Sequence, residues 1–398
     1  MSSRYRVLHL ITSFQTWSGA AENTKLTLDG LDRSHFEPFL GTGPPRPDHS
    51  TQQQVAADVR RIPIRWLTRP ISPVADAAAF VEILGAIRRY RFDVVHTHNA
   101  KDGILGRWAA FYAGVPAIVH TIHNVSFEAA TNPFARAQYA LQERWAARIT
   151  DRMLTVSKQN TTKYLNRGIG RPEQYRTVYS GLDLTRYAPD RRAPTELRAA
   201  LGLPPRPGPW VGWVGRFSPQ KDPVTFLRAA REIACAMPTV QFVVCGNTSD
   251  VKVERDPRLV AQDLGLNDTV HFLGFRRDVA DVFGAVDLVM HSSRYEGMGR
   301  VVCEAMACNR PVAGTAVDGV VEAIVSGERG GILVPPGDHN KLAVAALELL
   351  RHPALAQELA EAGRRWVEHN LSHEAMVATI EAVYGEVLSS RRRRAGSA

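Results

Sequence analysis

The sequence predicts an α/β protein of two doubly wound domains, each a parallel sheet with helices on both faces. Short β-rich apolar runs alternate with helical patterns along nearly the whole chain, as expected where crossover helices join parallel strands. The alternation pauses once, at residues 188–209, and then restarts. The chain has 398 residues, whereas a single domain usually holds ~100–200 residues. Two domains are therefore expected.

The first domain is expected over residues 1–187. A basic start precedes a short apolar run at 7–11, which is typical of a first buried strand and lacks the cleavage site of a signal peptide. Helical and β-rich segments then alternate. The expected strands lie at 7–11, 39–41, 93–98 and 117–123, and the expected helices at 20–31, 75–89 and 104–113.

The second domain is expected over residues 210–371. Residues 188–209, rich in proline, charge and alanine, are the expected linker. A helix at 372–390 carries apolar residues at helical spacing and is expected to cross back to the first domain, leaving 391–398 as a basic tail. The expected strands lie at 210–214, 241–245, 270–273, 288–291 and 312–314, and the expected helices at 223–236, 279–285 and 299–307.

This architecture also predicts where ligands bind. Open α/β sheets bind ligands beyond the carboxyl ends of their strands. With two such domains facing each other across a central cleft, the polar residues that follow the strands are the first candidates for a functional site. No stretch approaches the ~18–20 apolar residues that span a bilayer, so a cytoplasmic protein is expected.

The net charge of +9 is unevenly distributed. Residues 1–200 hold 27 Lys and Arg against 17 Asp and Glu, whereas residues 201–398 hold 22 against 23. The excess favours an anionic partner such as a lipid headgroup or a phosphorylated acceptor, or else is a solvated basic face. No nucleic-acid-binding signature accompanies it, so nucleic acid is not an expected partner. The four cysteines form no Cys-x-x-Cys pair, which predicts buried reduced thiols and neither disulfide nor zinc.

The segment 292–311 carries the densest pattern. Gly297 and Gly299 lie in a loop directly before an expected helix, an arrangement that presents backbone N–H groups to phosphate. Glu304 would lie about a turn into the helix, where a carboxylate can accept bonds from ribose hydroxyls. Glu296, before the loop, can reach a sugar or its developing charge. Either glutamate alone would also fit an acidic residue near a helix start, stabilised by the helix dipole.

A second pattern lies in the segment 212–222. Arg216 follows an apolar strand by two residues, and Lys221 stands five residues further on. Two fixed cations there suit a pyrophosphate and could replace a metal ion. Taken alone, they are equally two surface cations of a loop. No Asp-x-Asp occurs in the chain, so a magnesium-held diphosphate has no obvious ligands and no metal is expected.

Histidines gather at the expected strand ends of the first domain. His123 stands where an apolar strand gives way to polar residues, where a histidine could bond a sugar hydroxyl or orient the acceptor. His96 and His98 could form half a metal site, but no acidic or cysteine partner is spaced to complete it, which favours hydrogen bonding. The loop at 17–22 is not Gly-x-Gly-x-x-Gly, which argues against a dehydrogenase.

Together, these segments resemble glycosyltransferase family 4, whose members are retaining enzymes of the GT-B fold. The resemblance covers nearly the whole chain. It is carried, in this order, by SGAAE, DVVHTH, VHTIHN, RTVYSGLDLTRY, VGRFSPQKD, HFLGF, EGMGRVVCEAMACNRPVAG and GILVPPGD.

The resemblance implies a role for each marked residue. Arg216 and Lys221 would bind the donor diphosphate, and Glu304 the ribose. His123 matches a histidine that contacts the transferred sugar. The implied catalytic set is His123, Arg216, Lys221 and Glu296. The implied donor-binding set is Gly19 near the diphosphate, Phe275 near the base, Gly297, Met298, Gly299, Arg300, Val301 and Glu304.

The implied reaction moves a hexose or N-acetylhexosamine from a nucleotide sugar, by frequency a UDP-sugar, to a glycan or lipid-linked acceptor. Configuration would be retained, the leaving phosphate would help to deprotonate the acceptor, and neither a metal nor another cofactor would be needed. The stretch HTHNAKDGILGRWAA is similar to members that build bacterial surface polysaccharides. Together with the basic first half of the chain, this similarity predicts a peripheral enzyme that acts at the inner face of a membrane.

Three departures from the family pattern leave the charged donor-site residues in place. Ala20 stands where a second glycine is usual, Ser180 where asparagine is usual, and Asp318 where glycine is usual. Two alternatives to a transferase stay open. A nucleotide-sugar epimerase of GT-B fold would act on the donor alone, and a non-catalytic GT-B scaffold or partner subunit would not turn over.

Overall fold

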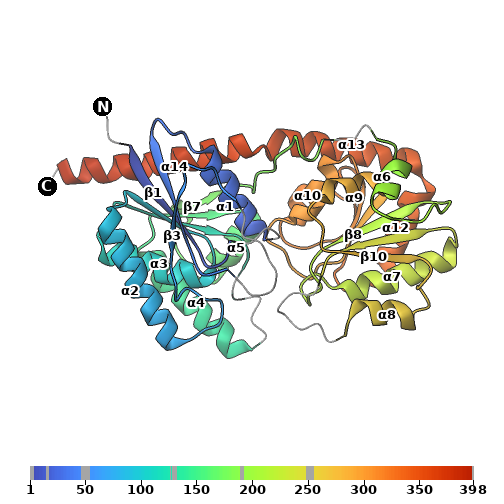
Figure 1. Cartoon of the computed structure of the whole chain (residues 1–398), viewed down its shortest axis with the longest axis horizontal. Helices are drawn as coiled ribbons and strands as arrows, with labels where there is room; N and C mark the ends of the chain where they lie inside the picture. Colours follow the sequence, from blue (N-terminus) through green and yellow to red (C-terminus); the bar gives the residue numbers. More distant parts are fainter. Residues whose placement is uncertain are drawn as a thin grey trace. The chain divides into compact units, whose positions relative to one another are not determined.

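The computed structural model describes residues 4–14, 18–45, 54–125, 127, 132–188, 192–247 and 255–396. The chain divides into two compact units (Figure 1). The first unit comprises Met1–Gly181 together with His373–Ala398, and the second comprises Leu182–Ser372.

The first unit is built on a parallel sheet of seven strands in the order β3-β2-β1-β4-β5-β6-β7. The central strands are buried on both faces, which explains their continuous apolar runs. The strands are β1 (Tyr5–Ile11), β2 (Phe36–Thr42), β3 (Arg60–Pro63), β4 (Val94–Thr97), β5 (Ala117–Ile122), β6 (Arg152–Thr155) and β7 (Tyr175–Thr177).

Helices cover both faces of this sheet (Figure 1). Helices α2 and α3 pack against Leu8, Leu10 and Val95 on one face, whereas α1 and α14 pack against Val7 and Val94 on the other. The helices of this unit are α1 (Gly19–Gly30), α2 (Pro73–Tyr90), α3 (Ala100–Tyr112), α4 (Pro133–Arg148), α5 (Lys158–Asn166) and α14 (His373–Gly396).

The last helix confirms the expectation that the chain returns to the first domain. Met376, Ile380, Tyr384 and Val387 of α14 are buried in the same core as α1 and β1. The expected boundary with a basic tail at residue 391 is wrong, because α14 continues to Gly396. Arginine has a high helix propensity, and no glycine or proline interrupts the arginine run.

The second unit repeats the architecture with a parallel sheet of six strands in the order β10-β9-β8-β11-β12-β13. Its strands are β8 (Trp210–Val214), β9 (Gln241–Cys245), β10 (Val270–Gly274), β11 (Leu288–His291), β12 (Val312–Thr315) and β13 (Gly331–Val334). Its helices are α6 (Pro194–Ala200), α7 (Pro223–Ala236), α8 (Pro257–Asp263), α9 (Val279–Ala285), α10 (Arg300–Ala307), α11 (Val320–Ala323), α12 (His339–Arg351) and α13 (Pro353–Asn370).

Two expectations are wrong in this unit. Residues 188–209 are not a linker, because the described part of this segment belongs to the second unit and forms α6, with Leu197, Leu201 and Leu203 buried. The chain passes between units at residues 181–182 and 372–373 instead. Cys235 is exposed rather than buried, near the end of α7, although the other three cysteines are buried.

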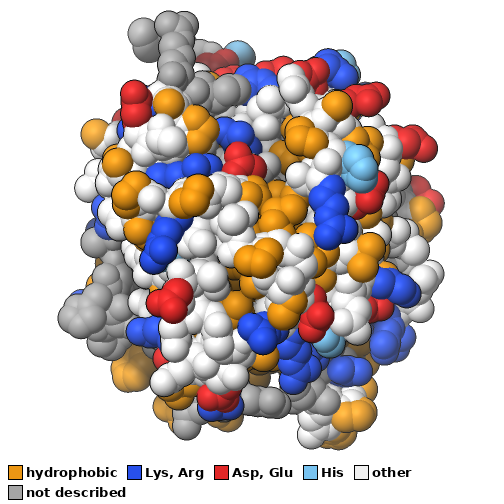
Figure 2. Space-filling view, turned by 90° about the vertical axis from the view of Figure 1, so that its right-hand side faces the viewer, with side chains coloured by type: hydrophobic (Ala, Val, Ile, Leu, Met, Phe, Trp, Pro, Cys, Tyr) orange, Lys and Arg blue, Asp and Glu red, His pale blue; other side chains and the backbone are white. Residues whose placement is uncertain are grey.

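The charge contrast seen in the sequence coincides with the two units. The first unit holds 27 Lys and Arg against 17 Asp and Glu, and the second 22 against 23. In the view of Figure 2, Lys and Arg side chains lie dispersed among acidic, apolar and uncharged ones. Within the residues described, no helix is both long enough and apolar enough to cross a bilayer.

Candidate functional site

In the second unit, Ser292 joins the loops that follow β8 and β11. Trp213 Nε1 donates a hydrogen bond to Ser292 Oγ at 3.0 Å, and Ser292 Oγ lies 2.9 Å from the carbonyl oxygens of both Lys221 and Asp222. Strands β8 and β11 are parallel neighbours, so both loops leave the same edge of the sheet. The two sequence segments singled out above, 212–222 and 292–311, thus form one site.

A buried ion pair lies at the centre of this site. Lys221 Nζ contacts Glu296 Oε1, and the side chains are only 15% and 8% exposed. Ser293 Oγ donates a hydrogen bond to the same oxygen at 2.8 Å, and His291 Nε2 lies 3.2 Å from it. Residues from β8 and β11 loops therefore converge on one carboxylate oxygen.

These contacts set the protonation states of the cluster. Burial alone would raise the pKa of Glu296, but the Lys221 ammonium and the bonds from His291 and Lys221 outweigh it and hold this pKa well below its usual range. Burial lowers the pKa of His291, against the opposing pull of Glu296. The site at neutral pH therefore holds a carboxylate, an ammonium and a neutral imidazole.

Two aspartates fix the backbone around the ion pair. Asp318 Oδ2 accepts a hydrogen bond from the Glu296 backbone N–H at 2.6 Å, and Asp318 itself has a left-handed backbone with φ 41°. Asp222 caps α7 by accepting from Thr225 N–H at 3.2 Å and also pairs with Arg294 Nε at 2.8 Å. Neither aspartate was predicted as a site residue, although Asp318 was noted as unusual.

The glycine loop leads into α10 as the sequence predicted. Gly299 is the N-cap residue with φ 76°, and a Cβ there would lie 2.6 Å from Val320 Cγ2. Met298 is buried. Arg300 Nε and Glu304 Oε1 lie 3.6 Å apart on the first turns of the helix, with both side chains largely buried. The N-terminal backbone N–H groups of α10 and the Arg300 cation therefore follow Glu296 within a few residues of the chain.

The remaining predicted residues of the second unit follow strands of the same sheet or lie on α10. Arg216, two residues after β8, is half-buried and has no ion-pair partner among the described residues. Val301 is half-buried on α10, and Phe275 is 42% exposed directly after β10. The structure brings Lys221 into contact with Glu296 and Arg300 into contact with Glu304. It places Arg216 after β8 and Phe275 after β10, two strands of the same sheet that are separated by β9.

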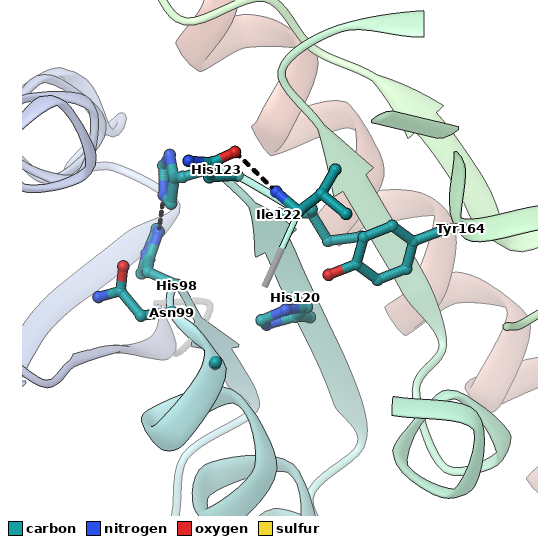
Figure 3. A pocket seen from close by; sticks show the side chains of 9 residues that line it. His98, Asn99, His120, Ile122, His123 and Tyr164 are labelled. Carbon is teal, nitrogen blue, oxygen red and sulfur yellow. Dashed lines mark hydrogen bonds between the residues drawn. The ribbon is translucent and has the colours of Figure 1, made fainter. Parts of the chain in front are cut away.

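In the first unit, His123 lines a cavity of about 110 Å³ at the end of β5 (Figure 3). His98 Nδ1 lies 3.0 Å from His123 Nε2, and the two rings are stacked. His120 and Tyr164 also line the cavity. His120 belongs to a different face of β5 from Thr121, and its Nδ1 lies 2.8 Å from Thr97 Oγ1.

The buried carboxylate of Asp102 organises this cavity and was missed by the sequence analysis. It accepts hydrogen bonds from the N–H groups of Thr12, His98 and Asn99 at 2.9–3.0 Å and from Thr12 Oγ1 at 2.6 Å. Burial raises the Asp102 pKa, and these bonds oppose the rise. The signal was available, because Asn99 and Asp102 have the spacing of a capping box.

Gly19 opens α1, whose N-cap Ser18 accepts a hydrogen bond from Ala21 N–H at 3.4 Å. Gly19 and His123 therefore lie in the first unit, whereas all other predicted site residues lie in the second. Trp17, part of the same predicted loop, lies outside the described residues.

A three-histidine group lies beneath the cavity of the first unit. The ring nitrogens of His9, His96 and His98 lie within 4.8 Å of one another, and all three side chains are buried. The sequence analysis looked for an acidic or cysteine partner of His96 and His98 and did not consider His9, which stands opposite His96 across β1 and β4. The nitrogens are already hydrogen-bonded to one another and to Tyr384.

Comparison with known protein families gives two matches that together cover most of the chain. Residues 208–352 match the family described as glycosyl transferases group 1, and residues 18–181 match the glycosyl transferase 4-like domain. The boundary between the two matches agrees with the two units of the structure.

Two curated relatives illustrate the similarity. The chain is 30% identical over 283 residues to the Escherichia coli UDP-Gal:alpha-D-GlcNAc-diphosphoundecaprenol alpha-1,3-galactosyltransferase. This alignment covers 70% of this chain and 72% of the relative. It is 33% identical over 317 residues to the D-inositol 3-phosphate glycosyltransferase of Salinispora arenicola, covering 75% and 70% of the two chains.

Solved structures share the fold over nearly the full length. Sucrose-phosphate synthase from Thermosynechococcus elongatus superposes with a TM-score of 0.81 at 23% identity, covering 97% of this chain and 100% of that one. Anabaena HepE in complex with UDP and glucose superposes with a TM-score of 0.78 at 21% identity, covering 96% and 100%.

Proposed function

Since the chain belongs to the glycosyltransferases of family 4 and has their two-domain GT-B fold, we propose that it is a retaining, metal-independent transferase of a hexose or N-acetylhexosamine. The observation that carries the proposal is the Lys221–Glu296 ion pair beside the glycine loop and α10. It puts a cation, a carboxylate and helix N–H groups at the carboxyl edge of one sheet, where a nucleotide sugar binds in α/β folds.

The donor is held mainly by the second unit. Arg216 and Lys221 bind the diphosphate, and the N-terminus of α10 supplies backbone N–H groups to the same anion. Glu304 accepts bonds from the ribose, and Phe275 lies near the base. Glu296 faces the sugar hydroxyls, with its position fixed by Ser293 and Asp318.

Metal independence is supported by how the acids of this site are engaged. Glu296 is paired with Lys221 and bonded by Ser293, and Asp222 is paired with Arg294 and the start of α7. A magnesium ion prefers carboxylates it can share with substrate phosphates, and these carboxylates already face cations. Lys221 and Arg216 supply the positive charge that the leaving diphosphate needs.

The reaction proceeds on one face of the sugar. The bond between the anomeric carbon and the donor phosphate breaks, and the acceptor oxygen bonds to the same face. The acceptor proton passes to the leaving phosphate oxygen, whose charge Lys221 and Arg216 stabilise as it develops. His123 bonds a hydroxyl of the transferred sugar and so orients the reacting carbon.

The relatives support a UDP-sugar donor and a lipid-linked or phosphorylated acceptor. The Escherichia coli relative is named for UDP-Gal and a diphosphoundecaprenol-linked acceptor, the Salinispora relative for an inositol phosphate, and the HepE structure contains UDP. The basic first unit suits either acceptor, since both are anionic.

Exposed basic and aromatic side chains on α4 of the first unit support the lipid-linked alternative. Arg148 lies over the Trp145 ring at 4.3 Å on α4, so basic and aromatic groups adjoin as in membrane interfaces. We therefore place the enzyme at the cytoplasmic face of a membrane, in cell-surface polysaccharide or glycoconjugate synthesis. Large apolar side chains exposed on the described part of this unit are Trp66, Ile71, Val74, Val81, Phe111, Tyr112, Phe134, Leu141 and Trp145.

The first experiment is calorimetric titration of EDTA-treated protein with UDP, GDP, ADP and dTDP, followed by the matching nucleotide sugars. Binding of UDP without metal is the expected result. A folded protein that binds no nucleotide would instead support a non-catalytic scaffold. Nucleotide binding that appears only on adding Mg²⁺ would contradict the metal-independent clamp.

Product analysis separates the remaining alternatives. With donor and acceptor, NMR of the first-formed product should show the anomeric configuration of the donor. An inverted product would contradict retention. With donor alone, conversion to an epimeric nucleotide sugar would identify an epimerase instead of a transferase.

A further inference from the structure

The imidazole of His291 is buried beside the Glu296 carboxylate. His291 is the last residue of β11, and its side chain is only 3% exposed. Met290 packs into the core on one face of the sheet, so the alternation along the strand sends the next side chain, that of His291, to the opposite face. There its Nε2 lies 3.2 Å from Glu296 Oε1. The ring is therefore in direct contact with the acid of the proposed donor site.

The chemistry of the partner fixes the direction of this hydrogen bond. The pKa of Glu296 is held well below its usual range, so the side chain is a carboxylate that can only accept. His291 Nε2 must therefore carry the hydrogen and donate it. Burial lowers the pKa of His291, so the ring is neutral and its other nitrogen, Nδ1, is bare.

The surroundings of Nδ1 agree with this tautomer. The atom is buried and has no hydrogen-bond partner among the residues that the structure describes. A buried N–H group without an acceptor is rarer in proteins than an acceptor without a donor. A bare nitrogen therefore fits this position better than a protonated one, and the ring has one proton to give, which goes to Glu296.

Three donors meet at the same carboxylate oxygen. Besides His291 Nε2, Glu296 Oε1 contacts Lys221 Nζ and accepts a hydrogen bond from Ser293 Oγ at 2.8 Å. A carboxylate oxygen offers about two lone-pair sites, so the protein itself occupies Oε1 fully. The three donors also approach from separate residues, which fixes the rotation of the carboxylate about its last bond.

The second oxygen of this carboxylate is left for a ligand. Each side-chain hydrogen bond of Glu296 to a described residue ends on Oε1, and none ends on Oε2. Solvent reaches Oε2, although the side chain as a whole is only 8% exposed. A negatively charged acceptor suits an uncharged hydrogen-bond donor such as a hydroxyl, and it repels a phosphate oxygen.

We infer that His291 is a positioning residue which, with Ser293, holds Oε1 of Glu296, so that Oε2 is the oxygen that accepts a hydrogen bond from a hydroxyl of the donor sugar. This inference rests on the proposed function, because it takes Glu296 to face the transferred sugar. It adds which oxygen meets the sugar and which buried group orients it. A carboxylate fixed in one rotation holds the sugar in one orientation, as transfer on a single face requires.

Nitrogen NMR tests the contact within the protein itself. In protein labelled with ¹⁵N at histidine, the ¹⁵N shifts distinguish a protonated from a bare ring nitrogen, and the signals of His291 are assigned by their loss in His291→Gln. At pH 7 without ligand, the wild-type protein should show a protonated Nε2 and a bare Nδ1. A bare Nε2 would overturn the inference, whether or not the protein binds a nucleotide.

The variants His291→Met and His291→Gln separate the donated bond from the volume of the side chain. Glutamine offers an N–H donor about where the imidazole Nε2 lies, whereas methionine has a similar shape and no donor. In His291→Met, binding of UDP-glucose or UDP-galactose should weaken about 3- to 10-fold, less than the ~10- to 100-fold value of a whole hydrogen bond to a charged group, because two donors still hold Oε1. Binding of UDP alone should stay within about 2-fold, and His291→Gln should restore most of the loss. Calorimetric titration measures each affinity.

The matched control is His271→Met. His271 lies near the start of β10, at the opposite edge of the same sheet, and its Nε2 lies 3.0 Å from Gln241 Oε1. This variant should leave the affinities for UDP and for both UDP-sugars unchanged.

The outcomes separate this inference from the proposed function. Equal weakening of UDP and of the UDP-sugars in folded His291→Met would show that His291 only supports the loop, and would overturn the inference. The same holds if His291→Gln binds the sugars no better than His291→Met. If the folded wild-type protein binds neither UDP-sugar, the proposed donor fails, while the nitrogen signals still decide whether His291 donates to Glu296.

Discussion

The two units share one topology but place opposite chemistry at equivalent strand ends. In the second unit, the ends of β8 and β11 carry formal charges in direct contact, with Lys221 and Glu296 buried together. In the first unit, neutral histidines stand within β1 (His9), within β4 (His96) and directly after β4 (His98); hydrogen bonds join His9 and His96 to Tyr384, and His98 to His9. Related parallel sheets therefore carry either a buried ion pair or a neutral hydrogen-bonded group, depending on the side chains on and after the strands.

Because of this difference, we expect the ion pair of the second unit and the histidines of the first unit to respond to different perturbations. Removing one partner of the charged pair leaves a buried charge, which is costly. Protonating one of the neutral histidines would put two donors where the hydrogen-bonded group supplies only one acceptor. The second unit should thus be sensitive to substitution of a charge, and the first to acid.

The largest expected effect is that of Lys221→Ala. We expect kcat/KM to fall by about 10²–10³-fold, because the cation that stabilises the leaving diphosphate is lost. The free energy of unfolding should also fall by about 3–5 kcal/mol, because Glu296 is left buried without its partner. Steady-state kinetics and denaturant unfolding measure the two effects.

The double variant Lys221→Ala/Glu296→Gln separates activity from stability. It should regain much of the lost stability, since no uncompensated charge remains, while its activity stays low. Lys341→Ala is the control, because Lys341 is 64% exposed in the same unit. Survival of both nucleotide binding and catalysis in Lys221→Ala would show that the cation does not hold the diphosphate.

The second prediction concerns acid. The pKa of His9 is about 3 in the folded chain and about 6.5 when unfolded, so between these values the unfolded state binds the extra proton. The contribution of neutral His9 to the free energy of unfolding is therefore fully present above pH 6.5, and it is lost as the pH falls towards 3. At pH 5, we expect a loss of about 2 kcal/mol from His9 alone.

Hydrogen exchange measured at several pH values distinguishes the units. His96 and His98, which face His9, share its lowered pKa, so β1 and β4 should lose protection first between pH 6.5 and 5. The pKa of Glu296 is depressed, so its contribution to stability is lost only as the pH falls below the ordinary carboxylate value. Burial also lowers the pKa of His291, but Glu296 opposes that shift, so the second unit should lose less protection than β1 and β4 by pH 5. Equal loss of protection in both units by pH 5 would contradict this contrast. His35→Gln provides a control, since His35 is exposed.

The third prediction uses the surface contrast between the units. Phe134 and Trp145 of α4 are 77% and 50% exposed, whereas Phe275 is the one large aromatic exposed on the described part of the second unit. Phe134→Ser/Trp145→Ser should weaken binding to vesicles containing phosphatidylglycerol about tenfold, through lost apolar burial. Co-sedimentation at low salt measures it.

The matched control for the surface is Val344→Ser, at an exposed apolar position of the second unit. It should leave vesicle binding unchanged. Wild-type protein that ignores these vesicles at low salt would remove the membrane from the proposed function, although a water-soluble acceptor would remain.

The sequence predicted most reliably those elements whose ends are marked by local chemistry. Helix α7 was predicted with the bounds observed, because Asp222 caps it and a proline occupies its first turn. The segment 188–209 was predicted wrongly, because its prolines and charges resemble a linker while Leu197 and Leu203 are buried against the second unit. Local composition does not reveal such tertiary packing.

The same distinction holds for the site. Lys221 and Glu296 stood in recognisable segments, and the structure joins them. His9 was missed, because it stands within the apolar first strand and acquires its role only from pairing beside His96 and from Tyr384 on α14, 375 residues further along the chain. Contacts between residues this distant depend on sheet order and helix docking.

The smallest expected effects are those of replacing the glycines at the starts of α10 and α1. Gly299 has φ 76°, and a Cβ there would approach Val320 Cγ2 to 2.6 Å, so Gly299→Ala should cost about 1 kcal/mol and weaken nucleotide binding several-fold. Gly19 lies within helix α1, whose backbone alanine favours, so Gly19→Ala should change the unfolding free energy by no more than about 0.5 kcal/mol. Thermal unfolding and titration with UDP compare the two variants. Equal effects at both positions would mean that the glycine loop of the second unit is not specially shaped for phosphate. A larger effect at Gly19 would move the phosphate contact to the first unit, where one glycine would then serve in place of the usual pair.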